Sequence, residues 1–194
     1  RGQMFALIVR RHMHLYGTRR EAFAEIALST RVNAMNRPKA MHREPLTLDD
    51  YFNARMIAEP LCLYDFCQET DGAVAVITTS AERAKDLRQP AVPVVAAAHG
   101  GVRDWGRAFA WVGMADEYFA SSGNKPIATR LYQQAGITAT DIDVALLYDH
   151  FTPMVLMQLE DYGFCEKGEG GAFVESGAIR FDGGSIPVNT HGGQ

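Results

Sequence analysis

Three short apolar runs alternate with helix signals along this chain, and this alternation constrains its fold more than any other feature. The runs occupy residues 73–79, 92–98 and 142–147 and are rich in valine, isoleucine, leucine and alanine. Capping residues or prolines open helices at residues 80–87, at 124–136 and from 152 onward. Buried strands that alternate with helices are typical of a sheet covered by helices. The pattern therefore predicts the α/β class.

The first quarter of the chain is predicted to be helical. Residues 4–16 and 19–36 carry apolar side chains near helical spacing. Thr18 and Glu21 have the spacing of a capping box for the second of these helices. A further short helix is expected over about residues 47–56.

Two histidines and a cationic segment in this part of the chain are candidate binding elements. His12 and His14 are two positions apart, so on a helix they point in different directions and cannot share a metal ion. Solvated or capping roles are expected for both. Residues 36–45 form a polar, exposed excursion whose cations could meet a phosphate-bearing ligand, although a solvated loop explains them more simply. These cations are Arg37, Lys39 and Arg43.

The composition is that of an ordinary globular protein. The 194 residues are 47% hydrophobic and 22% charged, with a formal net charge of -4. This is enough apolar material for one sizeable core or two small ones. No apolar run approaches the roughly 20 residues that a membrane span needs, so no membrane segment is expected. The mild acidity does not favour a nucleic-acid surface.

Cys62, Cys67 and Cys165 are an odd number of cysteines without C-x-x-C spacing. They favour a reducing cytoplasm over a disulfide framework or a zinc site, and buried apolar roles are expected for all three. No signal peptide is evident at the start of the chain. Because the chain lacks an initial methionine and stops directly after a polar loop, we expect it to be the middle of a longer protein.

Tyr148, Asp149 and His150 lie where the third apolar run meets the helix predicted from Thr152. Ligands of open α/β sheets bind at the carboxyl ends of strands. A phenol can stabilise an oxyanion or exchange a proton with a hydroxyl, and an imidazole can do either near neutral pH. Alternate residues of a strand share a face, so Tyr148 and His150 are expected on one side and Asp149 on the other. The alternative is structural, with Asp149 as a helix cap and Tyr148 in the core.

The loop VNTHGG at residues 188–193 is a second candidate site. Gly192 and Gly193 would let the backbone approach a ligand closely, and Asn189 and His191 supply polar atoms. The glycine-rich residues 168–171 lack the lysine and the context of a phosphate-binding loop. We interpret them as a flexible loop.

Four segments, in this order, resemble the thiolase superfamily. They are RMIAEPLCLYDFCQETDGA at residues 55–73, ATRLYQQAG at residues 128–136, the YDHF corner and the NTHGG loop. They are most similar to sterol-carrier-protein-type thiolases and thiolase-like lipid-transfer proteins. The resemblance implies a thiolase-like fold with two similar α/β halves, each a mixed five-stranded sheet with helices, and a homodimer. Residues 1–66 would end the N-terminal half with its loop region, and residues 67–194 would form most of the C-terminal half.

The corner motif distinguishes between activities within that superfamily. Tyr148 stands where the sterol-carrier thiolases carry the histidine of a His-Asp-Cys-Phe motif. A Tyr-Asp-x-Phe-Thr corner resembles instead the thiolase-like aldolases of steroid and terpenoid side-chain breakdown. Those enzymes cleave a branched β-hydroxyacyl-CoA by a retro-aldol reaction, in complex with an OB-fold partner that contains a DUF35 domain. The resemblance thus implies a cytoplasmic carbon–carbon lyase with a coenzyme A thioester as substrate and neither cofactor nor metal.

The roles of the candidate residues follow from this resemblance. Retro-aldol cleavage needs a proton acceptor and stabilisation of an enolate, whereas thiolysis needs a thiolate nucleophile. The implied catalytic residues are Tyr148, for proton transfer or oxyanion stabilisation, and His150 and His191 in support. The implied substrate-binding residues are Asp149, Asn189, Gly192 and Gly193. Two alternatives are a 3-ketoacyl-CoA thiolase and a non-catalytic carrier of lipid or acyl-CoA.

Overall fold

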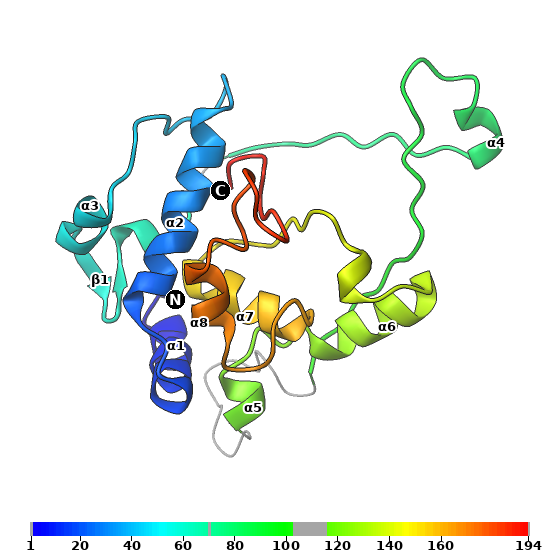
Figure 1. Ribbon diagram of the computed structural model, residues 1–194. Coiled ribbons are helices and arrows are strands. Elements are labelled where there is room, and N and C mark those ends of the chain that lie inside the picture. The colour runs from blue at the N-terminus through cyan, green and yellow to red at the C-terminus, as the bar shows by residue number, and fades with distance from the viewer. Residues whose placement is uncertain (1, 70, 103–115, 194) are drawn as a thin grey trace.

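The computed structural model describes residues 2–69, 71–102 and 116–193 (Figure 1). Its α-helices are α1 (Gly2–Tyr16), α2 (Arg20–Met35), α3 (Leu48–Asn53), α4 (Ala81–Ala84), α5 (Asp116–Phe119), α6 (Lys125–Ala135), α7 (Thr152–Asp161) and α8 (Gly170–Glu175). Two strands, β1 (Met56–Ala58) and β2 (Leu61–Cys62), and two single helical turns, η1 (Leu63–Asp65) and η2 (Ala139–Asp141), complete the described elements.

The core forms around α7, all ten residues of which are buried. Helices α2 and α8 pack against it, as the centre of Figure 1 shows. Apolar side chains from α1, α2, α7 and residues 174–188 form one cluster. Each large side chain buried there contributes about 1.5–3 kcal/mol. Residues from both predicted segments, 1–66 and 67–194, contribute to this core. The predicted boundary between the N-terminal and C-terminal thiolase-like halves at residue 66 stays a prediction.

The described residues do not form the expected five-stranded sheet. They contain a two-stranded antiparallel sheet of β1 and β2, in which Met56 faces Cys62. Isolated bridges join Phe66 to Phe151 and, in parallel, Ala145 to Val188. The strand predicted at residues 142–147 is therefore wrong in extent, because only a single bridge forms there.

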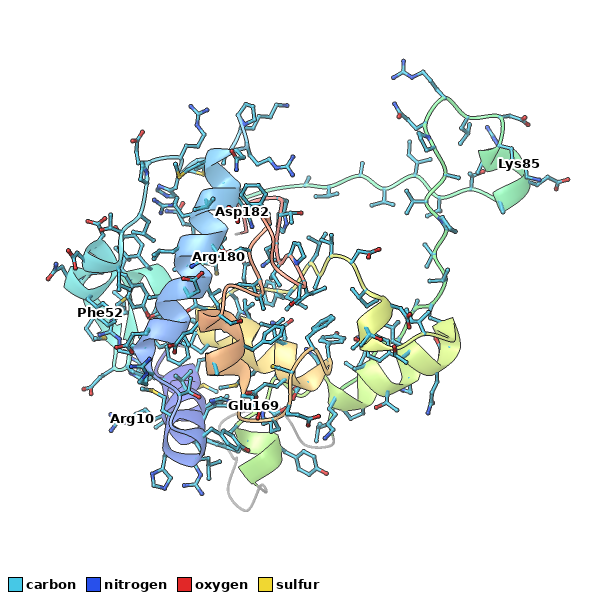
Figure 2. The ribbon with its side chains drawn as sticks, in the orientation of Figure 1. Arg10, Phe52, Lys85, Glu169, Arg180 and Asp182 are labelled. Carbon is cyan, nitrogen blue, oxygen red and sulfur yellow. The ribbon has the colours of Figure 1, made fainter. Side chains whose placement is uncertain are left out.

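The other two predicted strands lie extended in an arm that leaves the body (Figure 1). Helix α4 is at the tip of this arm, with Lys85 directly after it (Figure 2). Val74 in the first run is 92% exposed and Val92 in the second is 89% exposed. The prediction of buried strands at 73–79 and 92–98 is thus wrong for the described structure. Valine-rich runs favour extended backbone, but a ladder needs a neighbouring strand, and no other described residues provide one.

Local helix signals are mostly confirmed. Thr47 and Asp50 form a capping box at the start of α3, with the Asp50 N–H donating to the Thr47 hydroxyl over 3.1 Å. Helix α6 ends at Gly136 in the left-handed region, at a φ of 69°. Ser80 caps α4 as expected, although α4 is shorter than predicted. Such signals act over a few residues and so can be read from sequence.

The predicted cap at Thr18 and the predicted solvation of His12 are both wrong. Arg19 is the N-cap of α2, without a side-chain capping bond. The Thr18 hydroxyl instead lies 3.0 Å from His12 Nδ1, and His12 is fully buried. His12 Nε2 is 3.0 Å from both carboxylate oxygens of Glu160 on α7. The Thr18 hydroxyl therefore bonds to His12 rather than capping α2, and His12 is itself held by Glu160, 148 residues away.

The glycine-rich residues 168–171 are not a flexible loop. The backbone N–H groups of Gly168 and Gly170 donate to Glu160 Oε1 over 3.1 and 3.2 Å, and α8 begins at Gly170. A Cβ atom at Gly170 would lie 2.6 Å from Leu156 Cδ2 and 2.8 Å from Glu160 Oε1. Glycine is needed there so that the backbone can approach α7 closely.

Candidate functional site

The corner between residue 147 and α7 presents Tyr148 and His150 on one side. Their rings stack at 4.4 Å between centroids with an interplanar angle of 18°. Tyr148 is 57% exposed, and Asp149 lines a cleft that neither of its neighbours lines. The predicted alternation is confirmed. The structural alternative is wrong for Tyr148, because its side chain is 57% exposed and lies outside the core. A capping role for Asp149 stays a prediction.

The imidazole of His150 lies in an aromatic environment. The Phe5 ring meets it edge-on at 5.0 Å, and its Nδ1 atom is buried without a hydrogen-bond partner. Burial lowers the pKa of His150 to about 4. At neutral pH the ring is therefore uncharged, so it is suited to stacking and hydrogen bonding rather than to acting as an imidazolium acid.

The buried neutral His150 is expected to make stability depend on pH. Its folded pKa of about 4 lies below the ordinary 6.5, so the unfolded chain binds more protons between these values. The contribution of His150 is present above pH 6.5 and lost as the pH falls towards 4, by about 1–2 kcal/mol after allowing for solvent screening. Urea unfolding between pH 7.5 and 4.5 measures this loss. In His150→Gln the free energy of unfolding should depend less on pH over this range. The same dependence on pH in both proteins would contradict the prediction.

Asn189 connects the NTHGG loop to the corner. It is 1% exposed, at a φ of 48° that asparagine tolerates better than most residues. Its Oδ1 accepts from the Leu147 N–H over 2.8 Å, and its Nδ2 donates to the Leu147 carbonyl over 2.9 Å. The amide thus fixes the backbone of Leu147, and the predicted substrate contact of Asn189 stays a prediction.

A cleft of about 1200 Å³ opens on the Asp149 side of the corner. Its walls come from α2, the excursion after α2, residues 63–69 and the NTHGG loop. His191, Gly192 and Gly193 line it together with Asp149, so the structure gathers four of the seven predicted site residues. Tyr148, His150 and Asn189 do not line it.

The excursion at residues 36–45 gives this cleft a basic rim. Its residues are almost all exposed, as predicted. Arg37 donates from Nε and Nη2 to the Thr190 carbonyl at 3.3 and 3.0 Å, which joins the excursion to the NTHGG loop. The basic residues that line the cleft are Arg31, Arg37, Lys39 and His42. Clustered cations beside a pocket favour an anionic ligand.

Two glycines bring the NTHGG loop against its neighbours. A Cβ atom at Gly192 would lie 3.0 Å from Ala34 Cα on α2. A Cβ atom at Gly193 would lie 2.4 Å from both Asp149 Oδ2 and Thr30 Cγ2. The glycines therefore permit close packing of protein against protein, and their predicted contact with a substrate stays a prediction.

Gly193→Ala is expected to destabilise the protein by about 2–4 kcal/mol, since a positive φ costs an L-residue about 1–2 kcal/mol and overpacking about 1–3 kcal/mol. Gly193 has a φ of 73°. Gly136 is a matched control because its φ is 69° and a Cβ atom there would meet nothing within 4 Å. Gly136→Ala should lower the free energy of unfolding only by the cost of the positive φ, about 1–2 kcal/mol. Equal unfolding free energies of the two variants, measured in urea, would refute the packing argument.

Sequence reasoning missed two polar residues, Asp65 and Gln158, that hold the corner in place. Asp65, 1% exposed, accepts from the Tyr51 hydroxyl at 2.7 Å and from the Thr152 hydroxyl. Gln158, 6% exposed, bonds to the backbone of Tyr148. A signal for Gln158 was available, because a glutamine within the apolar run MVLMQL needs a buried hydrogen-bond partner.

Burial disfavours the thiolate form of the three cysteines, and the described acidic groups form no metal site. Burial raises the pKa of Cys62 and Cys67, and it raises that of Cys165 to about 12. All three thiols are free, and Cys67 lines the cleft. Within the part of the chain that the structure describes, no cluster of histidine, cysteine and acidic side chains could hold a metal ion, and none of the helices is long and apolar enough to cross a membrane.

Comparisons with known proteins match nearly the whole chain. Residues 112–194 match the family described as thiolase C-terminal domain-like. A 17-hydroxy-3-oxo-4-pregnene-20-carboxyl-CoA lyase of Mycobacterium tuberculosis is 46% identical over 194 residues, which cover 97% of this chain and 48% of the relative. A steroid side-chain-cleaving aldolase of Thermomonospora curvata is 42% identical over 197 residues, or 99% of this chain and 49% of the relative.

A solved structure shows the same arrangement of the chain. The structure described as the Ltp2-ChsH2(DUF35) aldolase is 39% identical and superposes with a TM-score of 0.89, over 100% of this chain and 50% of the other. This chain therefore spans about half the length of the relatives it matches.

Proposed function

Since this chain belongs to the thiolase superfamily, as its sequence motifs predicted, we propose that the protein is a carbon–carbon lyase that cleaves a branched β-hydroxyacyl-CoA. The relatives named above as a lyase and as a steroid side-chain-cleaving aldolase support this reaction and a steroid-like acyl group. The observation that carries the proposal is Tyr148, an exposed phenol stacked on a neutral His150 at the corner.

The reaction needs only groups that this corner supplies. A base takes the proton of the β-hydroxyl, the bond between Cα and Cβ breaks, and its electron pair passes to Cα as a thioester enolate. The β-carbon leaves as a ketone, and protonation of Cα gives the shorter acyl-CoA. We assign Tyr148 to the proton transfer or to the developing oxyanion, with His150 in support. No thiolate is required for this reaction.

The basic cleft is our proposed site for the coenzyme A phosphates. Arg37 and Lys39 on its rim suit phosphate groups. His191, Gly192 and Gly193 would lie along the coenzyme A arm, and Asp149 would accept hydrogen bonds from its amides. Because Tyr148 and His150 lie on the other side of the corner, we propose that the arm passes from the cleft around the corner, so that the thioester reaches the phenol there. The aldolase structure described above carries DUF35 in its name, so we propose a partner with a DUF35 domain. A homodimer, a cytoplasmic location and the lack of a cofactor are proposed with it.

Product analysis tests the proposed reaction. The full-length protein with a DUF35-type partner is incubated with a branched β-hydroxyacyl-CoA in the absence of free coenzyme A, and products are identified by mass spectrometry. We expect a ketone and a shorter acyl-CoA. Cleavage of a 3-ketoacyl-CoA that occurs only with added free coenzyme A would show a thiolase instead. Unchanged esters of both kinds with a bound acyl-CoA would show a carrier.

A further inference from the structure

Gln158 on α7 holds the backbone of the proposed catalytic tyrosine. Its Nε2 donates to the Tyr148 carbonyl over 2.7 Å, and its Oε1 accepts from the Tyr148 N–H over 3.3 Å. The same Nε2 donates to the Met154 carbonyl over 3.0 Å, one turn back on α7. A single side-chain amide thus pairs with both backbone groups of Tyr148, as a neighbouring strand would.

This contact is the last of a series of three amides that reaches the corner from α2. Asn33 on α2 donates from Nδ2 to the Val188 and Asn189 carbonyls at 3.0 and 3.2 Å. Asn189 pairs in turn with both backbone groups of Leu147, and Gln158 does the same for Tyr148. All three amides are buried, since Asn33 is 2%, Asn189 1% and Gln158 6% exposed.

We infer that Gln158 is a positioning residue for Tyr148, which it orients through the backbone without touching the substrate. The inference rests on the proposed function, in which Tyr148 is the reacting phenol. The Tyr148 side chain is 57% exposed and stacks on His150, so the core does not enclose it. A backbone fixed on both its donor and its acceptor restricts where the phenol can lie. The buried amide, rather than the core, therefore sets the geometry of the reacting group.

Gln158→Met in the full-length protein with its partner tests this role. Methionine has a similar volume and removes all three hydrogen bonds. We expect kcat to fall about tenfold with KM changed less than about twofold, because misplacing a catalytic group by a fraction of an ångström affects the transition state more than substrate binding. Met157→Leu on the same buried helix is the control for general disturbance of α7, and it should retain parental kcat.

A double variant separates positioning from mere structure. If Gln158 acts through the phenol, Gln158→Met should lower the residual rate of Tyr148→Phe by less than about twofold. A further tenfold loss on that background would overturn the inference. Hydrogen exchange gives a readout that needs no activity, since the Tyr148 amide should exchange faster in Gln158→Met. If Tyr148→Phe keeps the parental rate, the proposed function fails, whatever the exchange result. If the Tyr148 amide exchanges in Gln158→Met at the parental rate, the inferred role of Gln158 fails, whatever the kinetics.

Gln158→Glu adds a signature that a simple packing role would not show. An ionised carboxylate can accept from the Tyr148 N–H but cannot donate to the Tyr148 carbonyl, whereas the protonated acid can. Burial raises the pKa of such a carboxyl. The kcat deficit of Gln158→Glu relative to the parent should therefore shrink as the pH falls from 8 to 5.5. A deficit that is constant across this range would count against the role.

Discussion

Tyr148→Phe is expected to lower kcat for retro-aldol cleavage by at least about 100-fold, the range that a positioned acid or base contributes. The phenylalanine ring preserves the stack on His150, whose centroid lies 4.4 Å from that of Tyr148. Only the hydroxyl is removed, so KM should change by less than about threefold. Steady-state kinetics of the full-length protein with its partner, on a branched β-hydroxyacyl-CoA, measure both constants.

A second tyrosine provides the matched control for this substitution. Tyr132 on α6 donates its hydroxyl to the Tyr162 carbonyl over 2.8 Å, away from the corner. Tyr132→Phe removes one structural hydrogen bond, worth about 0.5–1.5 kcal/mol of stability, and should leave kcat unchanged. Parental turnover by Tyr148→Phe would remove the phenol from the mechanism, and equal losses in the two variants would point to a general effect of losing a hydroxyl.

The features that sequence predicted correctly depend on a few adjacent residues. The placement of Tyr148 and His150 on one side, with Asp149 on the other, follows from the alternation of side chains in extended backbone. The starts of α3 and α4 and the end of α6 follow from caps and a glycine. Caps and terminal glycines act through interactions within one helical turn, so residues far along the chain seldom override them.

The features that sequence reasoning missed depend on partners far along the chain. His12 pairs with Glu160, 148 residues away, which sequence spacing does not reveal. The cleft joins α2 to His191 and the following glycines, so it exists only after folding. The valine-rich runs at residues 73–79 and 92–98 show the same limit, since their sequence favours strands but contains no information on what pairs with them.

Glu160→Ala is expected to have the largest effect on stability, about 3–5 kcal/mol, as for the loss of one partner of a buried ion pair. The Glu160 side chain is fully buried and accepts from His12, Lys167 and the N–H groups of Gly168 and Gly170. Alanine would leave His12 Nε2 and the N–H groups of Gly168 and Gly170 without this acceptor. Urea unfolding of the full-length protein, followed by helical circular dichroism, measures the change.

Two further variants determine which part of the Glu160 network contributes this stability. Glu160→Gln keeps one acceptor for the glycine N–H groups but loses the charge, so an intermediate cost of about 1–3 kcal/mol is expected. Arg180→Ala is the control, because the side chain of Arg180, labelled in Figure 2, is 53% exposed and pairs with Glu25 at 2.7 Å. Exposed pairs contribute about 0–1 kcal/mol. A loss in Glu160→Ala no greater than that of Arg180→Ala would contradict the assignment.

The pH dependence of Glu160 provides an independent check on the same network. Burial raises the pKa of its carboxyl, but the hydrogen bond and charge of His12 and the Lys167 ammonium outweigh burial and hold the pKa below the ordinary 4.5. The carboxylate therefore stabilises the fold above pH 4.5, and this contribution is lost as the pH falls through the lowered value. Glu160→Gln should lack this acid-induced loss.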